Sequence, residues 1–325
     1  MARKAGNVYR IPRRFNWPFV IGGFAVLALA IMLGRWGGAA FDSTAYADTV
    51  RWLRGEAPLS ALRAPFAYRL AVPALAAVLP GALHNTFAAL NWICITATAC
   101  LATAAVRRMG FGTRRALGAG LLVVLSLPTF WYAPCALVDP ASVCMRMLFV
   151  FAVLTTQPRL ALAAALAATA VHEENILLLG WLLVTRRVAV NYGLAALAAA
   201  AGWLAAVRGA IVPGLAHGAW LPGVGTMGAR LGDTRGLLML AGCAGVVLPL
   251  ALAGIWRALP RIGALRSLLA LMALPALYGA VNLRVDGTGV WALYPFLVPF
   301  AVSLGLPGRT AKVPDVRPLR TSRRA

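Results

Sequence analysis

The sequence is poor in acidic residues and in charge as a whole. Only 9 of its 325 residues are Asp or Glu, and charged residues make up 12% of the chain, whereas hydrophobic residues make up 61%. A soluble domain of this length needs a larger polar surface, and a disordered chain carries far fewer apolar residues, so both classes are excluded. The mean hydropathy of +0.78 indicates instead a protein with many membrane-spanning helices.

Cysteine and histidine are also few, and they are scattered along the chain. The five cysteines form no CxxC pair, and the three histidines lie far apart, which argues against a disulfide framework and against a Cys/His metal site. The segment 172–175, His-Glu-Glu-Asn, begins like an HExxH zinc motif, but the second histidine is replaced by Ile176. The sequence therefore predicts no metal-ligating residues.

The apolar segments predict an all-α integral membrane protein with about ten transmembrane helices. A helix needs about 20 mostly apolar residues to cross a bilayer. Eight segments approach this length: 17–34, 84–106, 116–133, 141–156, 188–207, 237–256, 267–283 and 290–306. An N-terminal signal peptide is the alternative for the first of them, but the many later spans favour an uncleaved helix.

Two shorter apolar runs, 160–171 and 176–184, are separated by the polar segment 172–175. A single helix through both runs would place Glu173 and Glu174 near the centre of the bilayer, at a cost of about 2.5 to 3.5 kcal/mol for each charged acid. Basic residues also mark both outer ends of the pair, at Arg159 and at Arg186 with Arg187. We therefore predict a short helical hairpin with its acidic tip near the outer face.

The charges predict how the chain is oriented. The domain organisation is a single membrane domain, 17–306, between two basic tails, 1–16 and 307–325, that we place on the cytoplasmic side by the positive-inside rule. The formal net charge of +22 is then mainly a signal of orientation and does not predict nucleic-acid binding. In this topology all the acidic residues except Asp315 lie at the outer side. The acidic chemistry is therefore expected on the outer face.

The first outer loop, 35–83, contains the most informative pattern. Asp42 follows the first span almost at once, and 45–53 is amphipathic, which predicts a helix lying in the membrane interface. The segment 70–83 holds two prolines and is too short to cross, so it is predicted to be interfacial or re-entrant. Asp42 suits two roles equally, as a helix cap or as a catalytic carboxylate.

An acid just after the first span, a loop of short interfacial helices and the sequence PFAYR at 65–69 resemble the GT-C membrane glycosyltransferases. The resemblance is carried by the order of features along most of the chain. It implies an outer-face site, a polyprenyl-phosphate sugar as donor, and Asp42 as the general base on the acceptor hydroxyl. The first loop has no DxD or ExD pair, so the need for a divalent metal stays open. The chain also has no large outer domain, so its loops must recognise the acceptor.

The arginines of the outer side are candidates for binding the phosphate of the donor, because a guanidinium offers two parallel donors to phosphate oxygens. They are Arg69, Arg284 and the intramembrane Arg146, for which pairing with Asp139 is the alternative. Other candidates for the acceptor site or its cavity are Tyr68, Asp139, His172, Glu173, Glu174 and Asp286. Two alternatives stay open: the hairpin tip is simply solvated, and Arg284 pairs with Asp286.

These observations predict a glycosyltransferase of the bacterial cytoplasmic membrane that moves a sugar from a polyprenyl-phosphate donor to an acceptor hydroxyl on the outer face. Its partners would be membrane lipids and a glycan, lipid or protein acceptor. The Arg-rich, Lys-poor composition is typical of a GC-rich bacterial genome. The alternatives are a lipid or solute transporter or flippase, and a non-catalytic membrane component of envelope assembly. The lack of an internal repeat argues against a transporter.

Overall fold

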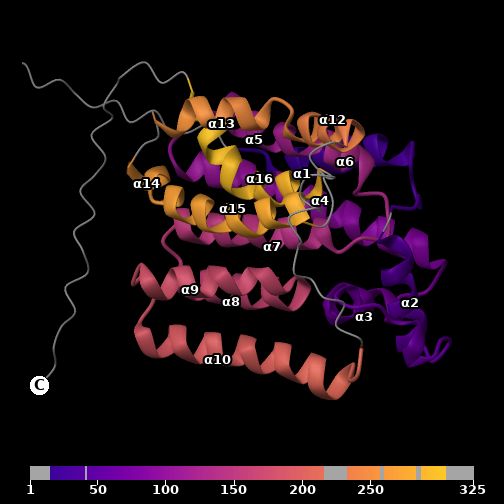
Figure 1. Ribbon diagram of the computed structural model, residues 1–325. Coiled ribbons are helices and arrows are strands. Elements are labelled where there is room, and N and C mark those ends of the chain that lie inside the picture. Colours follow the sequence, from indigo (N-terminus) through magenta and orange to yellow (C-terminus); the bar gives the residue numbers. More distant parts are fainter. Residues whose placement is uncertain (1–14, 41, 216–232, 257–259, 283–286, 305–325) are drawn as a thin grey trace, which may run out of the picture.

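The computed structural model describes residues 15–40, 42–215, 233–256, 260–282 and 287–304. Throughout these ranges the chain forms helices, turns and loops without a strand, so the predicted all-α class is confirmed (Figure 1). The predicted basic tails, 1–16 and 307–325, lie outside the described residues except for 15 and 16.

The helices follow one another in the order α1 (Trp17–Leu33), α2 (Ser43–Leu53), α3 (Ala71–Val78), α4 (Leu83–Arg108), α5 (Thr113–Val124), α6 (Leu127–Trp131), α7 (Asp139–Leu154), α8 (Pro158–Val171), α9 (Ile176–Val184), α10 (Val190–Ala206), α12 (Thr234–Ala244), α13 (Val247–Ile255), α14 (Pro260–Gly263), α15 (Leu265–Asn282) and α16 (Thr288–Ala301). Three 3₁₀ turns, η1 (Leu59–Ala61), η2 (Phe66–Tyr68) and η3 (Glu173–Asn175), and a π-turn, η4 (Val207–Ile211), complete the described elements.

Two of the predicted continuous helices are broken, which corrects the prediction. The segment 116–133 divides into α5 and α6 at Ser126, whose hydroxyl accepts a hydrogen bond from the Thr129 amide and so caps α6. The segment 237–256 divides into α12 and α13, which are bent by 60° at Gly245. Gly245 has a φ of +46°, a conformation that glycine adopts without a Cβ clash.

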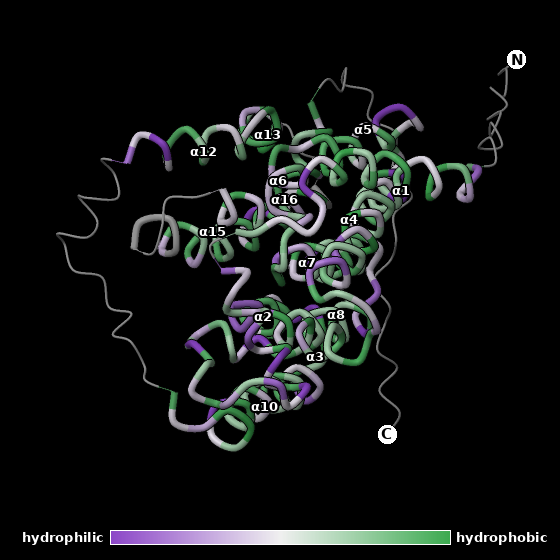
Figure 2. Tube along the Cα trace, turned by 90° about the vertical axis from the view of Figure 1, so that its right-hand side faces the viewer, coloured by the Kyte–Doolittle hydropathy of each residue, from purple (hydrophilic) through white to green (hydrophobic). Residues whose placement is uncertain are grey.

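The segment 35–83 and the hairpin have the predicted helical elements, whereas their placement at the outer face stays a prediction. Helix α2 covers the amphipathic segment, and α3 is an eight-residue helix that is about 12 Å long, as the two prolines of 70–83 predicted for a short helix. Helices α8 and α9 pack against each other and are joined by η3, so the two-armed hairpin is confirmed. Figure 2 faces this end of the bundle and shows hydrophilic segments around α2.

The apolar helices are those of a membrane protein. Helix α4, and α10 together with η4, are each long and apolar enough to cross a membrane, and the bent pair α12–α13 can act as a third span. Large apolar side chains are exposed on the outside of the bundle, among them Phe19 at 79%, Val184 at 82% and Trp256 at 83%. Many exposed apolar side chains spread over several helices indicate a surface that contacts lipid or another apolar partner.

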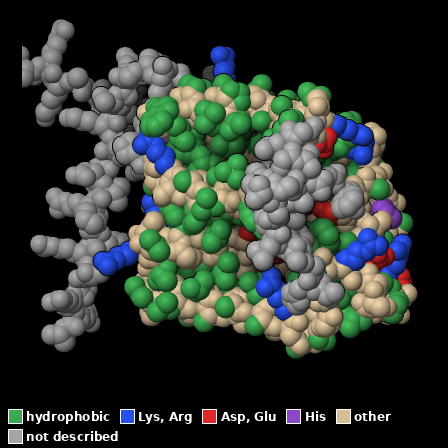
Figure 3. Space-filling model, in the orientation of Figure 1, with side chains coloured by type: hydrophobic (Ala, Val, Ile, Leu, Met, Phe, Trp, Pro, Cys, Tyr) green, Lys and Arg blue, Asp and Glu red, His purple; other side chains and the backbone are tan. Residues whose placement is uncertain are grey.

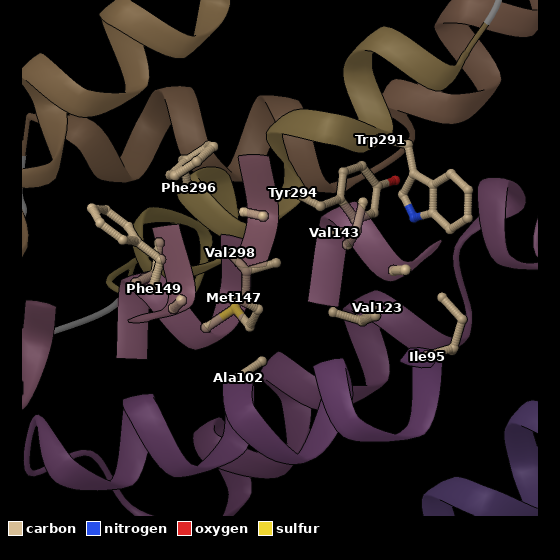
Figure 4. Packing of buried hydrophobic residues seen from close by; sticks show 14 of the residues in the cluster. Ile95, Ala102, Val123, Val143, Met147, Phe149, Trp291, Tyr294, Phe296 and Val298 are labelled. Carbon is tan, nitrogen blue, oxygen red and sulfur yellow. The ribbon is translucent and has the colours of Figure 1, made fainter. Parts of the chain in front are cut away.

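The core lies where α16 packs on α7 (Figure 4). Trp291, Tyr294 and Phe296 of α16 are fully buried, as are Met147 and Phe149 of α7. Helix α4 packs on one side of α7 and carries α5 on its own far side, whereas α8 of the hairpin packs on the other side of α7, followed by α10 (Figure 1). Helix α7 is therefore the central element to which the other layers attach.

The connections gather at two ends of the bundle. The α7–α8 and α9–α10 connections lie at one end, whereas α2 and α3 lie at the other (Figure 1). On the face shown in Figure 3, acidic side chains lie toward the end with α2 and α3, whereas Lys and Arg side chains occur at both ends. The acidic side chains visible on this face are thus gathered at one end of the bundle, together with arginines.

Candidate functional site

The candidate site is built on the turn between α8 and α9. Helix α8 ends at Val171 because His172 adopts an extended backbone, and the next three residues form η3 before α9 begins. The Asn175 amide group closes the turn by donating to the Ala168 carbonyl at 2.9 Å and to the Ser142 hydroxyl at 3.0 Å. The polar segment therefore becomes a rigid turn, and it presents two consecutive glutamates to neighbouring elements.

Glu173 binds Arg69, which directly follows η2 in the first loop. The guanidinium donates from Nε to Oε2 at 3.0 Å and from Nη2 to Oε1 at 3.1 Å, and its Nη1 donates to the Tyr46 hydroxyl at 2.9 Å. The Arg69 side chain is only 13% exposed. A two-point pair of this kind fixes the relative orientation of both groups. It joins the first loop, helix α2 and the hairpin into one unit.

Glu174 binds Arg146, which lies inside α7 with a side chain that is 1% exposed. The Arg146 Nε donates to the Asn175 Oδ1 at 2.5 Å, and its Nη1 donates to the Ala292 carbonyl of α16 at 2.9 Å. The predicted alternative partner was Asp139, but that residue lies two helical turns earlier on α7, about 10 Å away along the axis. Arg146 therefore connects three elements of the core through buried contacts that involve all three nitrogens of its guanidinium.

His172 lies between the two glutamates. Its Nδ1 is 3.8 Å from a carboxylate oxygen of Glu173 and 3.8 Å from one of Glu174, which is too long for a hydrogen bond. This nitrogen is buried and has no hydrogen-bond partner. Burial, and then the positive charge of Arg69, lower the pKa of His172 below its usual value, although the neighbouring carboxylates act in the opposite direction. The imidazole is therefore neutral at pH 7.

The two glutamates are ionised. Burial is the largest single influence and acts to raise the pKa of Glu173, but the charge and hydrogen bond of Arg69 and the His172 side chain together outweigh it and hold this pKa well below its usual value. The same balance, with His172 and Arg146 opposing burial, lowers the pKa of Glu174 to about 2. Carboxylates with such low pKa values are weak bases, so the two glutamates are suited to holding the arginines and poorly suited to removing a proton.

The two aspartates predicted for the site lie close to this cluster. The charges of Asp42 and Asp139 both act on the Tyr46 hydroxyl, and the charge of Asp139 also acts on Arg69 and on His172. Burial, more than these charges, raises the pKa of Tyr46, so its hydroxyl stays protonated. The structure thus brings Asp42, Asp139, Arg69 and the hairpin turn to one end of the bundle.

Asp42 occupies the N-cap position of α2, but its side chain makes no capping hydrogen bond to the first turn of that helix. The Ser43 hydroxyl is used locally instead, because it accepts a hydrogen bond from the Ala40 amide at 2.9 Å. The predicted role of the Asp42 side chain as a hydrogen-bonding helix cap is therefore wrong. The catalytic role stays a prediction.

Tyr68 lies in a second, smaller apolar cluster with Leu62, Ala67, Leu70, Val207 and Val212. The guanidinium of Arg208 stacks over its ring at 5.2 Å, so Tyr68 ties the first loop to the end of α10 and to η4. Arg284 and Asp286, and their predicted mutual pairing, lie outside the described residues.

Two members of the cluster were missed by the sequence reasoning. Tyr46 lies one helical turn after Asp42 on the buried face of α2, and Asn175 belongs to the polar segment that predicted the hairpin. The amphipathic pattern of α2 was the available signal for Tyr46. The contact between Arg146 and the Ala292 carbonyl had no such signal, because a backbone acceptor leaves no trace in residue types.

Within the described ranges, no group of three or more His, Cys, Asp or Glu side chains is arranged to hold a metal ion. Chemically, the cluster offers two carboxylates in Asp42 and Asp139, and a guanidinium in Arg69. That guanidinium has five N–H groups and uses three of them, which leaves two for a ligand. Comparisons of the chain with protein-family models, with curated proteins and with solved structures gave no match.

Proposed function

We propose that the protein is a multi-pass glycosyltransferase of the bacterial cytoplasmic membrane, which transfers a sugar from a polyprenyl-phosphate donor to an acceptor hydroxyl on the outer face. The observation that carries the proposal is the grouping of Asp42, Asp139 and Arg69 around Tyr46 at one end of the helical bundle. Glycosyl transfer needs a base for the hydroxyl and a cation for the leaving phosphate, and these groups supply both.

The proposed membrane placement has ten crossings and both termini on the cytoplasmic side. The site then faces outward, and the Arg-bearing connections face inward, in agreement with the positive-inside rule. Several described helices, such as the 14-residue α8 and α16, are about 21 Å long, which is shorter than the hydrocarbon core of about 30 Å. In this placement, we propose that a lipid-borne phosphate reaches the polar cluster at the end of these short helices.

In the proposed reaction the acceptor oxygen attacks the anomeric carbon while the bond from that carbon to the phosphate oxygen breaks. Asp42 takes the proton of the acceptor hydroxyl, and the polyprenyl phosphate leaves with the bonding electron pair. Arg69 donates its remaining N–H groups to the phosphate oxygens and offsets their charge. A single displacement inverts the anomeric configuration. In this proposal, Asp139 binds hydroxyls of the acceptor.

The sequence predicted that Arg146 binds the donor phosphate, but in this proposal it has a structural role. Its Nε, Nη1 and Nη2 each donate to a protein acceptor, and its side chain is buried. We therefore assign it to holding the α8–α9 turn against α7 and α16. In that role it fixes Glu174 and the adjoining Glu173, which in turn orients Arg69.

A second function, ion-coupled transport of a lipid or solute, is favoured by one observation. The Arg146–Glu174 pair is buried among helices, beside a neutral histidine with an unpaired nitrogen. Charged residues inside a membrane bundle often mark a translocation path. A transporter moves its substrate without cleaving it, which separates the two proposals by experiment.

The experiment is to reconstitute the purified full-length protein into liposomes with polyprenyl phosphates that carry labelled hexoses or pentoses, together with envelope extracts as acceptors. The expected result is transfer of label to an acceptor with release of polyprenyl phosphate in equal amount. Movement of intact donor across the bilayer without release would support the transporter. A protein that shows a cooperative thermal transition, and is therefore folded, but neither cleaves nor moves the donor would count against both proposals.

A further inference from the structure

At the end of the bundle away from the site, a cavity of about 450 Å³ opens between the start of α1, the last turns of α4 and the last turns of α7. It is lined by Phe15, Trp17, Ala104, Arg107, Arg108 and Phe151. Helix α4 runs from the site end to this cavity over 26 residues, or about 39 Å. The cavity is therefore separate from the cluster around Arg69.

Arg107 is held in place at the rim of this cavity. Its guanidinium stacks over the Phe15 ring at 4.8 Å, and its Nη1 donates to the Thr113 hydroxyl at 3.1 Å. Phe15 in turn packs edge-on against Trp17, with ring centroids 4.8 Å apart. The stacking and the single hydrogen bond orient the guanidinium and leave four of its five N–H groups for another acceptor. Arg108, the next residue, is exposed.

These two arginines do not belong to an ion pair in the described part of the chain. The described pairs between arginine and acid join Arg51 to Asp48, Arg69 to Glu173 and Arg146 to Glu174. A basic residue is favourable at the end of a helix in any case, because it faces the negative end of the helix dipole. That effect explains two arginines at the end of α4, but it does not explain a cavity walled by three aromatic rings.

We infer that this cavity binds an anionic phospholipid of the inner leaflet. The phosphate oxygens of the headgroup accept hydrogen bonds from Arg107 and Arg108, and the upper acyl chain lies against Trp17 and Phe151. Basic pockets between helices on the cytoplasmic side are suited to anionic headgroups, and aromatic rings favour the membrane interface. A free phosphate would gain nothing from the aromatic wall. The inference rests on the membrane placement proposed above and is independent of glycosyl transfer.

The test uses full-length protein purified in a zwitterionic detergent and titrated with phosphatidylglycerol, with phosphatidylcholine or with inorganic phosphate. Native mass spectrometry measures bound lipid, and the midpoint of thermal unfolding measures stabilisation. Phosphatidylglycerol is expected to bind and to raise the midpoint, whereas phosphatidylcholine and inorganic phosphate leave it unchanged. The variant Arg107→Gln/Arg108→Gln should bind phosphatidylglycerol roughly tenfold to thirtyfold more weakly.

The matched control is Arg114→Gln/Arg159→Gln, which removes two exposed arginines from the same end of the molecule but from outside the cavity. It should bind phosphatidylglycerol like the unchanged protein. A second variant, Ala104→Leu, keeps every charge and narrows the cavity from its wall, and it should also weaken lipid binding. Equal losses in both arginine variants, normal binding by Ala104→Leu, or equal stabilisation by inorganic phosphate would each overturn the inference.

Discussion

Arg69 and Glu173 form a two-point ion pair although 104 residues separate them in the chain. The pair joins the loop after α1 to the tip of the α8–α9 hairpin, and through the Tyr46 hydroxyl it also fixes α2. The neighbouring glutamate, Glu174, turns instead to Arg146 in the core. Two consecutive acids thus attach two different layers of the bundle to a single turn, and the candidate site is formed where those layers meet.

Breaking the pair between Arg69 and Glu173 is expected to lower stability. Arg69→Gln should reduce the free energy of unfolding by about 1 to 3 kcal/mol, because the pair is largely buried but not completely so. The control is Arg51→Gln, since Arg51 pairs with Asp48 on an exposed surface, and it should cost less than about 0.5 kcal/mol. Thermal unfolding in detergent measures both. Equal costs would show that the Arg69 pair has no special role.

A double-mutant cycle gives the direct test of that contact. The combined variant Arg69→Gln/Glu173→Gln should be destabilised by less than the sum of the two single variants, because each single variant leaves a buried charge unpaired. A destabilisation of the double variant equal to the sum of the two single destabilisations would mean that the two side chains do not interact in the folded protein.

Arg146→Gln is expected to be more damaging, at about 3 to 5 kcal/mol, because it leaves the Glu174 charge and two other acceptors without their donors. Arg159→Gln, an exposed change on the first turn of α8, should be nearly neutral. The yield of monodisperse protein and its thermal midpoint measure the difference. A fully stable Arg146→Gln protein would contradict the structural role assigned to this arginine.

Asp42→Asn is expected to reduce the turnover of the proposed transferase by at least about 100-fold while folding is unchanged, because an amide cannot accept the acceptor's proton. Asp48→Asn is a close control, since it removes an acid from the same helix on the side that pairs with Arg51. Turnover is measured as release of polyprenyl phosphate. Full turnover by Asp42→Asn would show that Asp42 is not the general base, and the transferase would then need a different residue as its base.

Acidification should destabilise the protein in two steps. The pKa of folded His172 lies below its ordinary value of 6.5, so the unfolded chain binds this proton first, and stability falls as the pH drops below about 6.5. Glu174, with a folded pKa of about 2 against an ordinary 4.5, contributes stability above pH 4.5 that is lost as the pH falls toward 2. His172→Gln should abolish the first step and make the second smaller without removing it, because Arg146 still lowers the pKa of Glu174 when His172 no longer does.

The control for the pH experiment is His84→Gln, which removes a histidine from the first turn of α4 that is not part of the cluster. This variant should keep both steps in the dependence of the thermal midpoint on pH. If His172→Gln and the unchanged protein show the same profile above pH 4.5, the burial of His172 has no consequence for stability.

Gly254→Ala tests the packing of the core at one point. A Cβ at this position of α13 would lie 2.0 Å from the Phe300 carbonyl oxygen of α16, and backbone cannot move aside cheaply. The expected cost is about 1 to 3 kcal/mol. Gly202→Ala in α10 is the matched control, because nothing lies within 4 Å of its Cβ position, and it should be neutral or slightly stabilising. Comparable thermal midpoints for the two variants would contradict this contact.

Local patterns predicted the helices well where the signal was long and apolar. The segment 84–106 became α4, and the polar segment 172–175 became the turn of a hairpin, because a run of four polar residues does not continue inside an apolar layer. The breaks at Ser126 and Gly245 were missed, since hydropathy averages over a window and does not register a single cap or a single glycine with positive φ.

The candidate site was predictable only in part. Asp42, Arg69, Asp139 and the hairpin acids stood out because charge is rare in this chain, and the structure brings them to one end of the bundle. Which acid binds which arginine was not predictable, and Arg146 received Glu174 in place of Asp139. Arg146 and Glu174 are 28 positions apart in the sequence, and Arg69 and Glu173 are 104 positions apart. Such pairs depend on how the helical layers pack, which no local sequence pattern predicts.

The sequence by itself determined that this is an all-helical membrane protein, because 61% hydrophobic residues with so little charge can be stabilised only by burying helices in lipid and in one another. Tertiary structure alone decided that Glu173 and Glu174 hold arginines, that His172 is neutral between them, and that two arginines and three aromatic rings line one cavity at the far end. Composition and hydropathy act on each segment separately, whereas ion pairs, pKa values and cavities arise only when distant segments are brought together.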